Sequence, residues 1–224
     1  MKSTISKTSK TLATLALVLL TMTTNRALAQ SYPPAKVLAA QWWQWVLAVP
    51  ASENPMTDTT GQFAAVNQRG RVWFLAGNVS GGTTVRTISV PAGKALFFPI
   101  VNVFDVEDGI GTGGVKVFMV HQPLQVAQEI VSSIIATAYG LSCEVDGSPI
   151  QINAANLEQS TPFSVFLPAD NILGVPAGIY FPFVDSGYYV LLAPLSSGHH
   201  TIHFAGGIAH FGTSLDVTYN ITVQ

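Results

Sequence analysis

The chain contains little cysteine and little charge. Of its 224 residues one is a cysteine, Cys143, so the protein cannot form an internal disulfide bond. A domain of this size can bury enough apolar surface to fold without one, and we expect Cys143 to be a small buried residue rather than a reactive thiol. Charged residues make up 10% of the sequence and hydrophobic residues 48%. This composition indicates a well-packed core rather than disorder.

Residues 1–29 have the pattern of a secretory signal peptide. Three lysines within the first ten residues precede an apolar run over residues 12–22, and residues 27–29 read Ala-Leu-Ala, the spacing of a cleavage site. We therefore expect the mature chain, residues 30–224, to be exported to the periplasm or the extracellular space. The apolar run is shorter than the roughly 20 residues of a membrane helix, and no later stretch of that length lacks polar residues. We expect no membrane span in the mature chain.

Positive charge is scarce once the signal is removed. Residues 1–29 contain four of the ten basic residues and none of the twelve acidic ones, which leaves a formal charge of −6 on the mature chain. Nucleic-acid binding needs clustered Lys and Arg to contact the phosphate backbone. The charge balance therefore argues against a nucleic-acid partner.

Two segments have apolar residues at helical spacing. Residues 34–49 carry an apolar stripe that includes Trp42 and Trp45, with prolines at both ends. Residues 123–139 repeat the pattern from Pro123 to a helix-ending glycine. We predict a helix over each range. The second is rich in β-branched residues, so its stability must come from tertiary packing.

The chain between these helices is predicted to form strands. Residues 71–77 and 94–104 are nearly continuous apolar runs bounded by Gly or Pro, which is typical of strands covered on both faces. Residues 85–90 alternate instead, and Arg86 falls on the same side as Ile88.

After residue 140 the chain reads as short strands separated by turn residues. Asp146-Gly147 favours a tight hairpin turn, and Asp185, which precedes Ser-Gly, is expected in another turn. Short strands at this spacing with two helices indicate a mainly β fold, an antiparallel β-sandwich or jelly roll with two accessory helices. We expect one domain over residues 30–224, and the alternative is a sub-boundary near residue 140.

The last strands resemble those of a known class of domain. The segments GYYVLLAPLSSGHHTIHF (187–204) and DVTYNITV (216–223) are similar to the closing strands of immunoglobulin-like modules. The resemblance implies an immunoglobulin-like second half, residues 141–224. The mature chain as a whole resembles uncharacterised bacterial exported β-sandwich proteins. Neither resemblance implies an activity or a role for any residue.

Trp43 is a candidate ligand contact. It lies in the stretch QWWQWVLAVP (41–50) and points about 100° around the predicted helix from Trp42, away from the apolar stripe. Either a second element covers it, or Trp43 and Leu47 form an exposed patch that contacts a ligand, a partner or a lipid surface.

His199, His203 and His210 are candidate metal ligands. Strand periodicity places His199 and His203 on one polar face of their strand, opposite the apolar Ile202 and Phe204. These two histidines are too far apart to chelate a metal without a loop ligand such as His210. The alternative is that they are solvated on an outward sheet face.

Asp105, Glu107 and Asp108 form an acidic stretch before a glycine-rich segment. Carboxylate and backbone oxygens in such a loop can bind calcium, although the spacing departs from that of the helix-flanked calcium loop. The alternative is a solvated turn. Arg71 and Arg86 are candidate contacts to an anionic ligand or to this loop, and the alternative for them is ordinary surface ion pairing.

The sequence contains no constellation typical of a known catalytic site. The preferred hypothesis is therefore an exported, non-catalytic β-sandwich protein that binds a small molecule, a glycan or an extracellular protein, without a cofactor. The alternative is a metal-dependent hydrolase or oxidoreductase on a jelly-roll scaffold, using calcium or a transition metal. A third hypothesis, an edge-strand assembly protein, requires long apolar strands with exposed edges.

Overall fold

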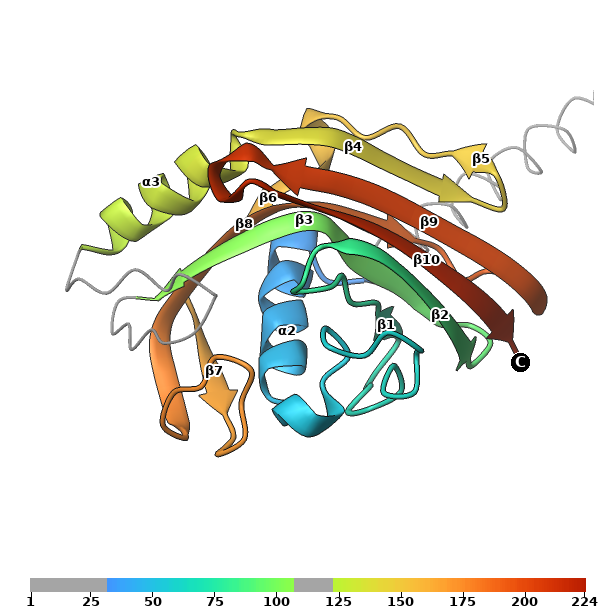
Figure 1. Ribbon diagram of the computed structural model, residues 1–224, viewed down its shortest axis with the longest axis horizontal. Helices are drawn as coiled ribbons and strands as arrows, with labels where there is room; N and C mark the ends of the chain where they lie inside the picture. Colours follow the sequence, from blue (N-terminus) through green and yellow to red (C-terminus); the bar gives the residue numbers. More distant parts are fainter. Residues whose placement is uncertain (1–31, 107–122) are drawn as a thin grey trace, which may run out of the picture. The chain divides into compact units, whose positions relative to one another are not determined.

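The structure is a computed structural model that describes residues 32–106 and 123–224. In this part of the chain no helix has the length and apolar character needed to cross a membrane. The helices and strands follow in chain order (Figure 1): α2 (Ala35–Leu47), β1 (Val72–Phe74), β2 (Gly82–Val90), β3 (Ala95–Val106), α3 (Leu124–Ile135), β4 (Ala138–Val145), β5 (Ser148–Pro149), β6 (Leu157–Gln159), β7 (Phe163–Leu167), β8 (Gly178–Leu192), β9 (Gly198–Ile208) and β10 (Thr213–Val223), with short 3-10 helices at Ala51–Glu53, Ala154–Asn156 and Ala209–Phe211.

The described strands form two sheets of mixed direction. Sheet A has the order β1-β3-β8-β6, with β7 also paired to β8, and sheet B has the order β2-β10-β9-β4-β5. The expectation of a purely antiparallel arrangement is wrong, because β1 pairs with β3, and β2 with β10, in parallel. β2 lies in sheet B between β1 and β3 in the sequence, and this crossover returns the chain to sheet A in its original direction.

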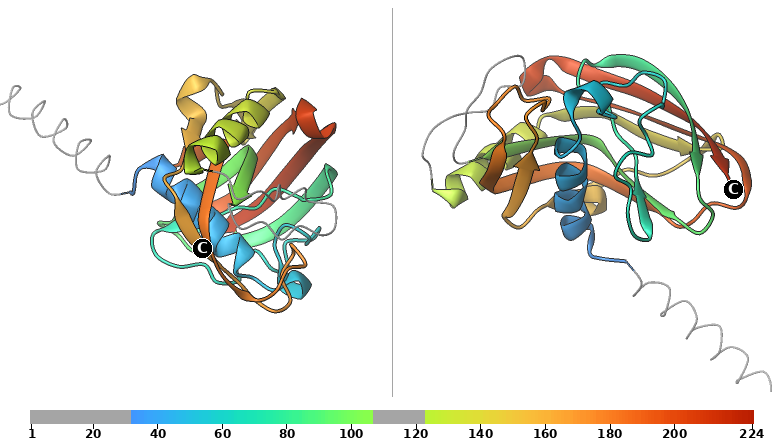
Figure 2. Two further views of the ribbon diagram at one scale, coloured as in Figure 1. Left: turned by 90° about the vertical axis from the view of Figure 1, so that its left-hand side faces the viewer. Right: turned by 90° about the horizontal axis from the view of Figure 1, so that it is seen from below.

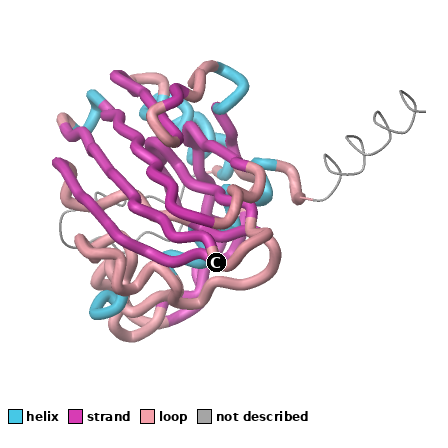
Figure 3. The backbone as a smooth tube through the Cα atoms, turned by 90° about the vertical axis from the view of Figure 1, so that its right-hand side faces the viewer, coloured by secondary structure: helices cyan, strands magenta, loops and turns pink. Residues whose placement is uncertain are grey.

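The prediction of a mainly β protein with two helices is confirmed. Strands from before and after residue 140 share each sheet, and Pro34–Gln224 form one compact unit. Figure 3 shows the strands of both sheets running in similar directions, with many of the loops gathered at their ends.

The two sheets pack together through a shared apolar cluster. Phe98 of β3 stacks on Phe204 of β9 with ring centroids 4.9 Å apart, and Phe204 stacks on Tyr219 of β10 at 6.3 Å. A second cluster packs α3 against β3 and β8 around the fully buried Val131. Burial of each such side chain contributes about 1.5–3 kcal/mol to folding.

The helix α2 crosses the face of sheet A that is turned away from sheet B (Figures 1 and 2). All three of its tryptophans are buried, and two donate their indole N–H to backbone carbonyls on either side of β1: Trp45 to Val66 before the strand and Trp42 to Leu75 directly after it, each at 2.8 Å. Sheet A covers the third, Trp43, so the expectation that a second element covers this side chain is confirmed.

Two turn expectations have different outcomes. Asp146 and Gly147 connect β4 to β5 and both have positive φ, 52° and 73°, as a tight hairpin turn requires. Asp185 does not lie in a turn. It lies within the long strand β8, because the ladder with β3 continues on both sides of it, from Leu96 opposite Leu192 to Val106 opposite Phe183.

Arg86 is a buried cation that joins sheet B to the chain before it. Its side chain shares the inner face of β2 with Ile88, as the alternation predicts, but it is only 1% exposed, so the alternative of ordinary surface ion pairing is wrong for Arg86. The guanidinium donates to the carbonyls of Asp58, Ala76 and Gly77 at 2.7–2.9 Å and to the Tyr219 hydroxyl at 2.8 Å. A buried charge is tolerated when hydrogen bonds replace its hydration, and here three loop carbonyls do so.

Replacing Arg86 should therefore destabilise the fold. Arg86→Met removes the guanidinium donor from the carbonyls of Asp58 and Gly77 in a dry environment, while Ala76 keeps the hydrogen bond from the Tyr219 hydroxyl, and we expect the free energy of unfolding to fall by about 3 kcal/mol or more. The exposed Arg69 provides a matched control, and Arg69→Met should change stability by less than about 0.5 kcal/mol. Urea denaturation of both variants checks this, and equal losses would contradict the structural role of Arg86.

Candidate functional site

A cleft of about 380 Å³ is lined by residues of both sheets and of α2. One wall is the stretch Val101–Phe104 of β3, and another is formed by Trp43 and Leu47 of α2. The remaining lining comes from the end of β9, the start of β10 and three loops: Met56, Asn78, Val79, Gly81, Ile172, Leu173, Gly206, Gly207, Ile208, His210, Phe211, Thr213, Ser214 and Leu215. Its volume lies in the range of small-molecule sites.

The cleft lies where two strands continue beyond their neighbours. β1 pairs with β3 only over Ala95–Phe97, so the rest of β3 has no strand on that side within the described ranges. β2 pairs with β10 from Leu215 onward, which leaves Thr213 and Ser214 beyond the end of β2. The cleft therefore lies where the short strands β1 and β2 end and their longer partners β3 and β10 continue.

Trp43 forms part of the wall rather than an exposed patch. Its ring packs edge-on against Phe104 with centroids 4.7 Å apart, and the side chain is 4% exposed. Leu47 is fully buried and lies one helical turn further along the same wall. The structure thus places Trp43 in a position to contact a bound ligand, and that role stays a prediction.

A buried polar network lies behind this wall. The side chain of Asp185 is fully buried, and its Oδ2 accepts a hydrogen bond of 2.5 Å from the Tyr189 hydroxyl, which in turn accepts one of 3.1 Å from the Asn102 amide. Among the described residues, neither Asp185 Oδ1 nor Trp43 Nε1 has a hydrogen-bond partner. Asn102 and Trp43 both line the cleft, so they connect the carboxyl group to it.

Burial is the main cause of the shifted pKa values of Asp185 and Tyr189. Loss of hydration raises the pKa of Asp185 from 3.8 to about 7, although the hydrogen bond from Tyr189 and the nearby Ser160 hydroxyl and Trp43 indole lower it. Burial also raises the pKa of Tyr189 well above its usual value, and the negative charge of Asp185 adds to the effect. Asp185 is therefore a carboxyl group that changes protonation near neutral pH, close to the cleft but outside its lining.

Gly187 allows the network to form. A Cβ on Gly187 would lie 2.6 Å from Asn102 Cβ and 2.8 Å from the Tyr189 ring, distances at which the strands would have to separate. Glycine at this position lets Asn102 and Tyr189 approach each other on the α2 face of sheet A.

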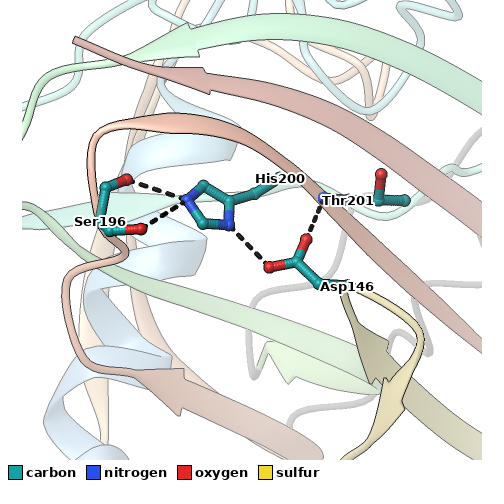
Figure 4. Close-up of polar contacts among 4 residues, drawn as sticks. All are labelled: Asp146, Ser196, His200 and Thr201. Carbon is teal, nitrogen blue, oxygen red and sulfur yellow. Dashed lines mark hydrogen bonds and ion pairs between the residues drawn. The ribbon is translucent and has the colours of Figure 1, made fainter.

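A second arrangement, at the surface, has the composition of a catalytic triad (Figure 4). His200 Nδ1 lies 2.7 Å from Asp146 Oδ2, and His200 Nε2 lies 3.3 Å from Ser196 Oγ. However, Nε2 is closer, at 2.9 Å, to the Ser196 carbonyl oxygen, which can only accept a hydrogen bond. Nε2 therefore carries a hydrogen and cannot take a proton from the serine. The group joins the β4–β5 turn to the loop before β9.

The three histidines predicted as metal ligands do not form a metal site within the described residues. His199 lies 3.2 Å from Thr222 Oγ1, and His203 lies 3.3 Å from Asp216 Oδ1. Four residues of strand separate these two histidines by about 13 Å. His210 follows β9 and lines the cleft. No group of three His, Cys, Asp or Glu residues that could hold a metal is present in residues 32–106 and 123–224.

The remaining candidates are placed separately. Arg71 is exposed directly before β1, whereas Arg86 is buried. Asp105 lies within β3 and is 3% exposed, and its Oδ1 accepts a hydrogen bond from the Val106 N–H at 2.8 Å. Glu107 and Asp108 lie outside the described residues, so the calcium-loop prediction stays a prediction.

Three residues of the buried network, Asp185, Tyr189 and Asn102, were not predicted from the sequence as site residues. One signal was present, because Asn102 is the only strongly polar residue in the apolar run 94–104 apart from the initial lysine. The sequence around Asp185 instead indicated a turn, because Asp-Ser-Gly is an ordinary turn sequence.

Comparison with known proteins does not assign a family. No family model matches the sequence, and no curated protein matches it. Two solved structures match. The first is the structure of PbICP-C in complex with falcipain-2, with 12% identity over 69% of this chain and 100% of the other and a TM-score of 0.26. The second is the solution structure of amebosin, with 11% identity over 63% and 96% of the two chains and a TM-score of 0.19.

The raised pKa of Asp185 predicts how stability depends on pH. The folded state keeps a proton that the unfolded state loses near pH 3.8, so the free energy of unfolding should fall as the pH rises from about 4 to about 7 and then level off. Asp185→Asn should remove this fall, worth up to about 4 kcal/mol at pH 8. Urea denaturation between pH 4 and pH 8 measures it, and the exposed Asp170→Asn should keep the wild-type slope. A wild-type slope in Asp185→Asn would contradict the assignment.

The surface pair gives a separate prediction. The hydrogen bond from His200 to Asp146 raises the pKa of His200, and the same bond lowers the pKa of Asp146. The pair should therefore stabilise the fold most between about pH 4 and pH 6.5 and lose its effect as the pH rises through the His200 pKa. Asp146→Asn should lower the His200 pKa in an NMR titration, whereas Asp216→Asn should leave it unchanged. An unmoved His200 pKa in Asp146→Asn would show that the pair does not form.

Proposed function

We propose that the protein is an exported, non-catalytic binding protein with a β-sandwich fold, and that the cleft beside β3 is its ligand site. The observation that carries the proposal is the 380 Å³ cleft with Trp43 in its wall. The shared apolar cluster between sheets A and B supports the sandwich, and the signal-like residues 1–29 support export.

The lining of the cleft favours an uncharged ligand. Among the described residues, no Asp, Glu, Lys or Arg borders it, and its walls are apolar and aromatic with a few amides, hydroxyls and His210. Asn78 adds a specific contact, because its buried Oδ1 has no hydrogen-bond partner in the described part of the chain, while its Nδ2 donates to Gly82 and Thr84. A ligand with an N–H or O–H group would satisfy this acceptor.

The enzymatic alternative has one point of contact with this site. Of the three histidines proposed as metal ligands, His210 borders the cleft, and His199 and His203 are not among its lining residues. A metal-dependent hydrolase or oxidoreductase would need further ligands near His210. The binding protein requires none, and we therefore prefer it.

Blocking the cleft should remove binding without affecting the fold. Ser214 is exposed and lines the cleft, so Ser214→Trp places a bulky side chain at its rim, whereas Asn220→Trp places the same side chain on an exposed position of β10 outside the lining. A library of uncharged fragments with about 10–20 non-hydrogen atoms serves as the probe, in thermal-shift and ligand-observed NMR experiments.

Fragments that bind the wild-type protein and Asn220→Trp should bind Ser214→Trp at least about tenfold more weakly. Equal binding to all three proteins, or no bound fragment at all, would contradict the proposed site. Turnover of any bound compound by the wild-type protein would contradict the non-catalytic function.

A further inference from the structure

We propose that the cleft binds an extended peptide segment, which adds to the free edge of β3 as a further strand. This inference rests on the proposed function and specifies its ligand class.

The edge of β3 faces the cleft. Four consecutive residues, Val101–Phe104, line it, although successive side chains of a strand point to opposite faces of the sheet. They can border one cleft together only if the strand turns its edge toward it. Their other edge is paired with residues 185–188 of β8. Within residues 32–106 and 123–224 no strand pairs with the backbone N–H and C=O groups at the cleft edge, and such groups require hydrogen-bond partners, which an added strand would supply.

Apolar side chains stand on both sides of this edge. Trp43 and Leu47 border the cleft from α2, whereas Ile208 and Leu215 border it from sheet B. A strand added beside β3 would direct its side chains alternately to these two sides. A compact ligand would need only one such side, but an extended peptide uses both.

The chemistry of the lining also fits a peptide backbone. No Asp, Glu, Lys or Arg among the described residues borders the cleft, so these four residue types offer the ligand no ion pair in this part of the chain. The Asn102 amide already donates to Tyr189, so main-chain groups supply the polar contacts along β3. In strand addition, main-chain hydrogen bonds provide affinity and side-chain pockets provide specificity.

The start of β10 sets the width of the site. Thr213, Ser214 and Leu215 line the cleft together with Val101–Phe104, and an added strand needs about 4.8 Å beside β3. Four residues of β3 span about 13 Å, which accommodates about four residues of ligand. We therefore expect a short, uncharged segment with apolar residues at alternate positions.

Alternate N-methylation tests strand addition directly. The probes are blocked hexapeptides in which threonine alternates with valine, leucine or phenylalanine, and the best binder is found by NMR shift mapping on the full mature chain. In an added strand every second N–H points to β3. N-methylation of one alternate set should therefore weaken binding at least about tenfold, whereas methylation of the other set should change it less than about threefold. Ser214→Trp should no longer bind the unmethylated peptide, whereas Asn220→Trp should still bind it.

The outcomes separate this inference from the proposed function. If both methylated sets bind equally, or if no peptide binds while uncharged fragments still bind in a manner sensitive to Ser214→Trp, strand addition is wrong and the ligand site remains. If neither peptides nor fragments bind, the proposed function fails as well. If Ser214→Trp binds the peptide as tightly as the wild-type protein does, the peptide does not bind in this cleft.

Discussion

The pairing of β3 with β8 is the constraint on which the rest of the structure depends. It runs in antiparallel register from Leu96 opposite Leu192 to Val106 opposite Phe183, with one irregularity between Pro99 and Val101. Strand periodicity then determines the faces. One set of side chains packs with sheet B and α3, and the other, which includes Asp185 and Asn102, lies beneath α2 with Trp43. Because β1 is short, the same pairing leaves the other edge of β3 exposed to the cleft.

Two buried ionisable side chains show how hydrogen-bond supply determines charge in this core. Arg86 has four acceptors for its guanidinium, three of them carbonyls, so its charge is solvated by the protein. Asp185 accepts a side-chain hydrogen bond from Tyr189, but its Oδ1 has no partner among residues 32–106 and 123–224, and burial favours the neutral acid. The first group stabilises the fold, whereas the second makes the wall of the cleft sensitive to pH.

Local features of the fold could be predicted because they depend on neighbouring residues. The apolar stripe located α2, the Asp-Gly dipeptide located the hairpin turn, and period-two alternation placed Arg86 on the same face of β2 as Ile88, although it did not predict that the guanidinium is buried. Asp185 could not be located in this way. Its turn propensity is overridden by a ladder with a strand about 80 residues earlier, and nothing near Asp185 in the sequence encodes that partner. The cleft could not be predicted from the sequence for the same reason, because its position depends on where the β1–β3 and β2–β10 ladders end.

Amide hydrogen exchange along β3 in the free protein tests the central claim, that this strand has one paired and one open edge. If the claim is correct, the amides from Val101 to Phe104 will alternate, with those bonded to β8 protected and those between them exchanging at least about 100-fold faster. Uniform slow exchange over these residues would show that the cleft edge is already covered and would contradict the account.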